Sequence, residues 1–248
     1  MLAISSGKGG VGKSTISANI AVALGNIGLK VGLMDTDIYG PNIPGILGSH
    51  DRPVTNPDTG QIKPIEAHNI KFISMGLLLE EGSPVIWRGP MLAKMINQFL
   101  SNVEWGELDI LIADLPPGTG DVQLTLTQSA PLTSALILTT PSAIALEDVR
   151  RGVEMFRQAE VPILGLVENM SSFRCDACNH NEYLFGHGQS KSTAEELEIP
   201  FLCDIPIDIK LRECADNGQP AVFSQPTTAG SEAIINLAKI VIACLEEK

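Results

Sequence analysis

Short apolar runs alternate with longer segments of helical periodicity along most of the chain. Two of these runs, Ile110–Ala113 and Ala135–Leu138, are apolar at every position, which is typical of parallel strands covered on both faces. The pattern predicts strands at Leu2–Ser6, Lys30–Asp35, Ile70–Ser74, Asp109–Asp114, Ser134–Thr139, Ile163–Glu168 and Phe201–Ile205. It predicts helices at Ser14–Ile27, Pro90–Asn102, Leu146–Ala159 and Gly230–Glu246. This alternation indicates an α/β fold with a doubly wound, mostly parallel sheet.

We expect one domain over residues 1–248, because no repeat, low-complexity tract or linker divides the chain. Residues 48–70 are rich in Pro, Asn, Asp and Gly, so they are expected to form an excursion with at most a hairpin. A second irregular insert is expected near residues 171–189, from about Ser171 to Gln189, and it contains a C-x-x-C sequence.

The segment Gly7–Ser14 reads Gly-Lys-Gly-Gly-Val-Gly-Lys-Ser and fits G-x-x-x-x-G-K-[ST] at every fixed position. It lies between a predicted strand and a predicted helix, where inward-pointing backbone N–H groups and the helix dipole favour phosphate. Lys13 is expected to reach the β- and γ-phosphates, and Ser14 to join the shell of Mg²⁺. The sequence therefore predicts a site for a nucleoside triphosphate. The expected contact residues are Gly7, Gly9, Gly10, Val11, Gly12, Lys13, Ser14 and Thr15.

Composition narrows the range of partners. A formal net charge of −12 argues against a broad nucleic-acid footprint and against adhesion to an anionic membrane. The apolar runs fall well short of the ~20 residues that a membrane span needs. Because the phosphate-binding motif begins at Gly7, we expect no signal peptide. The 5 cysteines, an odd number, favour a reducing cytoplasm over a disulfide framework.

Acidic residues follow two of the predicted strands, at the edge where ligands of open α/β sheets bind. Asp114 suits a magnesium shell, and Gly118 or Gly120 after it could bring a backbone N–H close to the γ-phosphate. Another strand ends at Asp35, a further candidate contact. Asp37 is our candidate for positioning the water that hydrolysis requires. The alternative for each aspartate is a helix-capping or turn carboxylate.

Lys8 is a second lysine within the phosphate-binding loop, and the motif does not require it. In a single chain we expect it to point away from its own phosphate cradle. It could then reach the phosphates of a facing subunit, or it could be a solvated surface lysine.

Cys175 and Cys178 form a C-x-x-C pair, a spacing that lets two thiolates face one metal ion or cluster. Two ligands are too few for zinc or for an iron–sulfur cluster. His180 and His187 could complete a zinc site within one chain, or a two-fold axis could bring a second C-x-x-C opposite the first. The other cysteines, which could contribute from afar but fit core positions better, are Cys203, Cys214 and Cys244.

The loop Lys8–Lys13, a deviant Walker A motif, resembles the P-loop ATPases that include septum-site, plasmid-partition and nitrogenase iron proteins. Further segments resemble the Mrp/Nbp35/ApbC branch of this group, the iron–sulfur cluster carrier ATPases. Those segments are Met34–Asn42, Trp87–Pro90, Trp105–Asp121 and Glu168–Ser171. The resemblance spans residues 4 to about 220, nearly the whole chain.

The resemblance implies roles for individual residues. Lys8 corresponds to a lysine that contacts the partner subunit's nucleotide, and Asp37 to an acidic residue that activates water. Asp114 corresponds to the Walker B aspartate, and Asn169 to an asparagine that hydrogen-bonds adenine. The residues implied to line the base pocket are Pro206, Ile207 and Asp208.

Cys175 and Cys178 correspond to a pair that holds a labile [4Fe–4S] cluster between two subunits. The resemblance thus implies a homodimeric ATPase that uses ATP and Mg²⁺ and passes clusters to apo-proteins. Two other classes stay open. One is a MinD/ParA-like spatial-organising ATPase without a cluster, and the other is a zinc-stabilised nucleotide-binding scaffold.

Overall fold

The computed structural model describes residues 1–38, 40–78, 89–175 and 177–246. Three segments discussed above lie partly outside this range. The residues concerned are Tyr39 of Met34–Asn42, Trp87 and Arg88 of Trp87–Pro90, and Asp176 between Cys175 and Cys178.

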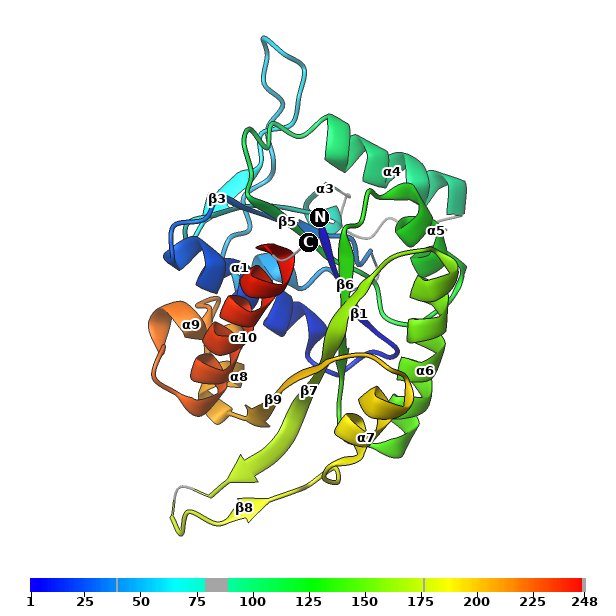
Figure 1. Ribbon diagram of the computed structural model, residues 1–248. Helices are drawn as coiled ribbons and strands as arrows, with labels where there is room; N and C mark the ends of the chain where they lie inside the picture. The colour runs from blue at the N-terminus through cyan, green and yellow to red at the C-terminus, as the bar shows by residue number, and fades with distance from the viewer. Residues whose placement is uncertain (39, 79–88, 176, 247–248) are drawn as a thin grey trace.

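In the described part of the chain, one 9-stranded sheet organises the molecule (Figure 1). Its order is β3-β4-β2-β5-β1-β6-β7-β8, and β9 also pairs with β7. Pairing is parallel from β4 to β7 and between β7 and β9, and antiparallel for β3 and β8. The strands are β1 Leu2–Ser6, β2 Val31–Asp35, β3 Ile65–Ala67, β4 Ile70–Ser74, β5 Ile110–Asp114, β6 Ser134–Thr139, β7 Ile163–Arg174, β8 Asn181–Glu182 and β9 Phe201–Ile207.

Helices cover both faces of the sheet, which confirms the doubly wound α/β prediction (Figure 1). One face carries α1, α8, α9 and α10, and the other carries α4, α5, α6 and α7. Their bounds are α1 Lys13–Asn26, α2 Ile43–Ile46, α3 Met75–Leu78, α4 Gly89–Ser101, α5 Asp121–Ser129, α6 Ala143–Gln158, α7 Gln189–Glu196, α8 Ile209–Asp216, α9 Ala221–Ser224 and α10 Ala229–Glu246. Among the residues described, no helix combines the length and apolarity that crossing a bilayer requires.

The two cores follow from the alternation of side chains along each strand. In β1, Leu2 and Ile4 pack into the core beneath α1 and α10, whereas Ala3 packs into the core beneath α4, α5 and α6. The same division separates Leu136 from Ile137 in β6. Every residue of β1 and β6 is buried, so their apolar runs reflect cover on both faces.

The structure differs from the sequence prediction at the second insert. Ser171–Arg174, expected to be irregular, continues β7, which runs for 12 residues and pairs antiparallel with β8. The expectation for these residues was wrong, because β8 and β9 supply backbone partners that no local pattern reveals. In the earlier excursion, β3 and β4 form a hairpin whose turn residues His68 and Asn69 have φ of 47° and 63°.

Two glycines hold α2 and α8 together. Gly48 follows α2 and Gly218 follows α8, with φ of 63° and 67°. A Cβ on Gly218 would lie 2.5 Å from the Cα of Gly48, so the two backbones are in direct contact. Only residues without a side chain allow this approach at left-handed φ.

We therefore expect Gly218→Ala to lower the free energy of unfolding by about 3 kcal/mol, from left-handed strain plus overpacking. Gly60→Ala is the matched control, because Gly60 has a φ of 73° and open space around its would-be Cβ. Urea unfolding monitored by circular dichroism measures both. Equal losses in the two variants would contradict the backbone contact as a source of stability.

Candidate nucleotide site and cysteine pair

The phosphate-binding loop connects β1 to α1 at the carboxyl edge of the sheet. Gly10 and Gly12 have φ of 81° and 86°, and Gly12 is the N-cap residue of α1. Gly7 packs against the backbone of Asp148 in α6, where a Cβ would overlap it. The loop borders a cavity of about 460 Å³. Its walls include the predicted residues Lys8, Gly9, Gly10, Val11, Gly12, Lys13, Ser14, Thr15 and Asp37.

A buried carboxylate, Asp114 at the end of β5, gathers the polar groups of this loop. Its Oδ1 lies 2.9 Å from Lys13 Nζ and accepts a hydrogen bond from Ser17 Oγ at 2.7 Å. Its Oδ2 accepts from Ser14 Oγ, also at 2.7 Å. Asp114 is 0% exposed and Lys13 is 6% exposed. Carboxylate and hydroxyl oxygens are the donors that Mg²⁺ prefers, so Asp114 and Ser14 fit a magnesium site.

Asp35 lies beside Asp114, because β2 and β5 pair in register at these residues. Its carboxyl group accepts hydrogen bonds from Ser74 Oγ at 2.8 Å and from the Asp37 N–H at 3.2 Å. Burial, and then the charge of Asp114, raises the pKa of Asp35 from 3.8 to about 8. At neutral pH the Asp35 carboxyl therefore stays mostly protonated.

Asp37 follows β2 and is a carboxylate that reaches the cavity wall. Its Oδ1 accepts a hydrogen bond from the Gly40 N–H at 3.2 Å. The preceding residue, Thr36, donates from Oγ1 to the Asp114 carbonyl at 2.8 Å, which fixes this turn to β5. The Gly118 N–H donates to the Ser6 carbonyl at 2.9 Å, and the approach of Gly118 or Gly120 to the γ-phosphate stays a prediction.

Lys8 also lies on the cavity wall, and its Nζ donates to Ser142 Oγ at 3.5 Å. Ser142 is the N-cap residue of α6 and accepts from the Ala145 N–H at 3.4 Å. The side chain thus leans toward a neighbouring helix. A contact between Lys8 and the nucleotide of a second subunit stays a prediction.

The residues predicted to bind the base come from β7, from β9 and from the start of α8. Asn169 of β7 donates from Nδ2 to the Val11 carbonyl at 2.8 Å, so it touches the phosphate-binding loop itself. Asp208 caps α8, accepting from the N–H groups of Lys210 at 2.8 Å and Gly230 at 2.9 Å. Pro206 lies in β9, and a base-binding role for these residues stays a prediction.

The cavity extends beyond the loop toward α2 and α8, which sequence reasoning did not implicate. The wall residues missed in this region are Asn42, Gly45, Ile46, Ala215 and Asp216. Apart from Asn42, the last residue of the Met34–Asn42 segment, no motif marks them, since α2 and α8 meet through the Gly48–Gly218 contact between distant parts of the chain.

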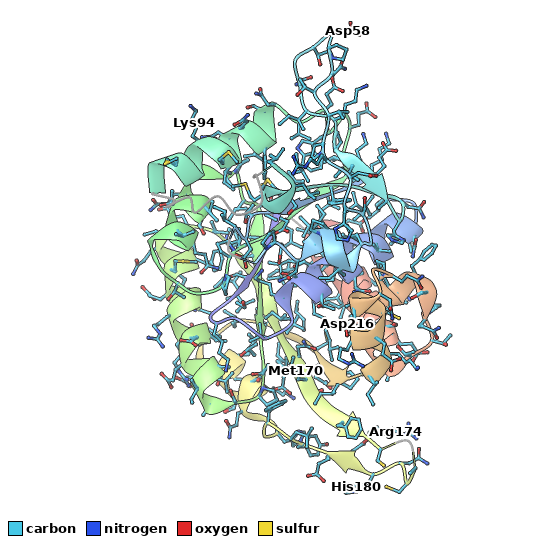
Figure 2. All side chains as sticks on the ribbon, turned by 180° about the vertical axis from the view of Figure 1, so that it is seen from behind. Asp58, Lys94, Met170, Arg174, His180 and Asp216 are labelled. Atoms are coloured by element: carbon cyan, nitrogen blue, oxygen red, sulfur yellow. The ribbon has the colours of Figure 1, made fainter. Side chains whose placement is uncertain are left out.

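Cys175 and Cys178 lie at the tip of the β7–β8 hairpin, the first half-buried and the second exposed. The turn is closed by the Cys175 N–H, which donates to the His180 carbonyl at 2.9 Å, and by the Asn179 N–H, which donates to the Cys175 carbonyl at 2.8 Å. In Figure 2, Arg174 and His180 lie far out on this hairpin, away from the body of the sheet.

Within the residues that the structure describes, no group of three or more His, Cys, Asp or Glu side chains is placed to hold a metal ion. His180 lies 3.3 Å from Glu182, and the His187 ring packs on Tyr183 with centroids 4.1 Å apart. The structure therefore does not assemble the one-chain zinc site considered above. The remaining cysteines pack against the core: Cys203, Cys214 and Cys244.

A parallel sheet with a phosphate-binding loop after β1 and an aspartate at the end of the adjoining β5 defines a P-loop NTPase. A family model described as "ParA: NUBPL iron-transfer P-loop NTPase" matches residues 1–242. The chain therefore belongs to the NUBPL iron-transfer family of P-loop NTPases.

Named relatives of similar sequence agree with this assignment. The chain is 51% identical over 243 residues to the iron-sulfur cluster carrier protein of Synechocystis, covering 96% of this chain and 69% of the relative. It is 47% identical over 248 residues to the iron-sulfur cluster transfer protein NUBPL of Dictyostelium discoideum, covering 99% of this chain and 76% of the relative.

Solved structures show the same fold. A nucleotide-binding protein from Archaeoglobus fulgidus, solved in complex with ADP, has a TM-score of 0.81 and 37% identity, covering 93% of this chain and 90% of that one. The cell division ATPase MinD of Pyrococcus furiosus has a TM-score of 0.72 and 26% identity, with 98% of each chain covered.

The proton on Asp35 links stability to pH. Burial raises the pKa of Asp35 from 3.8 to about 8. The stabilisation by the neutral carboxyl is therefore fully present below pH 3.8 and is lost as the pH rises through about 8. Asp35→Asn stays neutral throughout. We expect its Tm, without added nucleotide, to exceed that of the wild type by a margin that grows from about pH 5 to about pH 8.5. Asp51→Asn is the exposed control, and parallel Tm profiles for Asp35→Asn and the wild type would contradict the assignment.

Proposed function

We propose that this protein is an ATP-hydrolysing iron–sulfur cluster carrier. It acts as a homodimer in the cytoplasm, holds a [4Fe–4S] cluster between the Cys175 and Cys178 pairs of two subunits, and delivers it to apo-proteins. The observation that carries the proposal is a cysteine pair on a hairpin continuous with β7, the strand that touches the phosphate-binding loop through Asn169. Relatives named as cluster carriers and transfer proteins support it.

The nucleotide chemistry follows from the charges around the cavity. Backbone N–H groups of the loop and the start of α1 bind the phosphates, and Lys13 exchanges part of its contact with Asp114 for phosphate oxygens. Ser14 and Asp114 would hold Mg²⁺, and the bound ion would neutralise charge that develops on the phosphates. Asp37, anchored by Gly40 and at the cavity wall, orients the attacking water and accepts its proton.

A second subunit completes both sites in this proposal. Two thiolates from each chain give the four ligands that a [4Fe–4S] cluster requires. Lys8 lies at the cavity wall, and in the proposed dimer it adds positive charge beside the partner subunit's phosphates. The cluster is cargo, so the protein must release it, and ligands on an exposed hairpin suit release.

The roles of Lys13 and Asp37 predict different defects. Lys13→Ala removes the loop's buried cation and should abolish ATP binding. Asp37→Ala should bind ATP and MgADP with wild-type affinity while its turnover falls ~100-fold or more. Calorimetric titration and phosphate release measure the two effects, with Lys30→Ala as a surface control, since Lys30 pairs with exposed Glu107. Wild-type hydrolysis by Asp37→Ala would remove it from the mechanism.

Anaerobic reconstitution with iron and sulfide tests whether two chains bind one [4Fe–4S] cluster. We expect about four irons and four sulfides per two chains, together with dimer formation on a sizing column. Cys175→Ser and Cys178→Ser should lose the cluster. Cys203→Ser is the matched control, because burial raises the pKa of that thiol to about 12 and makes it a poor ligand.

Other outcomes of the same experiment distinguish the alternatives. Bound zinc without iron would favour the zinc-stabilised scaffold. ATP hydrolysis with neither metal, undiminished in the Cys175→Ser variant, would favour a spatial-organising ATPase like the MinD protein that shares this fold.

A further inference from the structure

One hydrogen bond joins the phosphate-binding loop to the strand that carries the cysteine hairpin. Asn169 in β7 donates from Nδ2 to the Val11 carbonyl at 2.8 Å, and its side chain is 5% exposed. The two residues are 158 positions apart in the sequence. The side-chain amide of Asn169 lies directly against Gly12, because a Cβ on Gly12 would overlap Asn169 Nδ2.

The geometry of the peptide bond extends this contact to the cavity. The described chain has no cis peptide bonds, so the Val11–Gly12 peptide is planar and trans. In such a unit the carbonyl and the N–H point in opposite directions. By holding the Val11 carbonyl toward β7, Asn169 turns the Gly12 N–H away from β7, and Gly12 is a cavity-wall residue. A fixed N–H at a helix N-terminus is a ready donor for phosphate.

The other end of the connection is a bulge in β7. Asn169 pairs with Ile205 of β9 and Phe173 pairs with Ile207, so β7 uses more residues than β9 over this stretch. Met170, the first residue of the bulge, has a left-handed φ of 59°. Figure 2 shows Met170 close to the body of the sheet, with Arg174 further along toward the hairpin tip. A bulge is where a strand bends most readily.

The geometry points to Asn169 as a positioning residue that aims the Gly12 N–H at the nucleotide phosphates and transmits their binding through the Met170 bulge to the cysteine hairpin. The inference deepens the proposed function, on whose nucleotide-binding part it rests. Phosphate that draws the Gly12 N–H forward moves the Val11 carbonyl with it, since both belong to one rigid peptide. Asn169 follows the carbonyl, and the bulge turns this shift into a change of hairpin angle.

Two substitutions isolate the N–H donor of the Asn169 side chain. Asn169→Ala removes the amide, and Asn169→Asp keeps the shape but sets a carboxylate oxygen against the Val11 carbonyl. Ser171→Ala is the matched control on the same strand, because Ser171 Oγ donates to Asp204 of β9 at 3.2 Å and not to the loop.

We expect the dissociation constant of MgADP to rise about tenfold in Asn169→Ala, the value of one hydrogen bond to a charged group, and further in Asn169→Asp. Ser171→Ala should bind as the wild type does. Calorimetric titration measures this, and thermal unfolding verifies that the variants fold. Wild-type affinity in folded Asn169→Ala and Asn169→Asp would overturn the positioning role.

Hydrogen exchange tests transmission to the hairpin, a readout that a merely structural side chain would leave unchanged. At saturating MgADP, the amides of residues 170–174 should change their exchange rates several-fold in the wild type and in Ser171→Ala, but not in Asn169→Ala. An undiminished response in Asn169→Ala, or none in the wild type, would overturn the transmission. Neither readout requires a cluster, so a failed reconstitution leaves this test intact and counts against the proposed function alone.

Discussion

The buried carboxylate of Asp114 is the interaction on which the candidate nucleotide site depends. A charge with 0% exposure is costly unless ion pairs and hydrogen bonds replace its lost hydration. Lys13 supplies the counter-charge, and the hydroxyls of Ser14 and Ser17 supply hydrogen bonds. All three come from the first turns of α1, whose positive dipole end favours the same anion. Satisfying this one group therefore fixes the start of α1 against the end of β5, with the phosphate-binding loop between them.

The three aspartates near the ends of β2 and β5 have different surroundings. Asp35 is next to Asp114 in the sheet and equally buried, so a second charge there would meet both desolvation and repulsion. Protonation avoids that cost, and Asp35 becomes a structural group bonded to Ser74. Asp37 escapes the crowding because Thr36, anchored to the Asp114 carbonyl, carries the chain out to the cavity wall. One carboxylate can thus serve a cation and another can serve water.

The sequence predicted those features that depend on local pattern. Apolar runs identified the central strands, and the glycine and lysine spacing identified the loop, because each is encoded within a few neighbouring residues. The end of β7 was missed because Ser171 and Ser172 are polar, and because Phe173 and Arg174 take their strand partners from β8 and β9. The contact of Asn169 with Val11 was missed for the same physical reason. Spacing along a chain does not say which distant carbonyl an amide will reach.

The placement of the cysteines follows from thiol chemistry. A metal or cluster ligand must be a thiolate, and burial opposes its formation, as the pKa of about 12 for Cys203 shows. For the proposed role in carrying a cluster, a cysteine pair therefore belongs on an exposed element, which a sheet covered on both faces does not offer. The extended end of β7 turns back through β8 and forms such an exposed element, while β7 itself stays continuous. Because Asn169 of that strand also holds the Val11 carbonyl, the exposed pair is joined to the phosphate-binding loop by one continuous strand and one hydrogen bond.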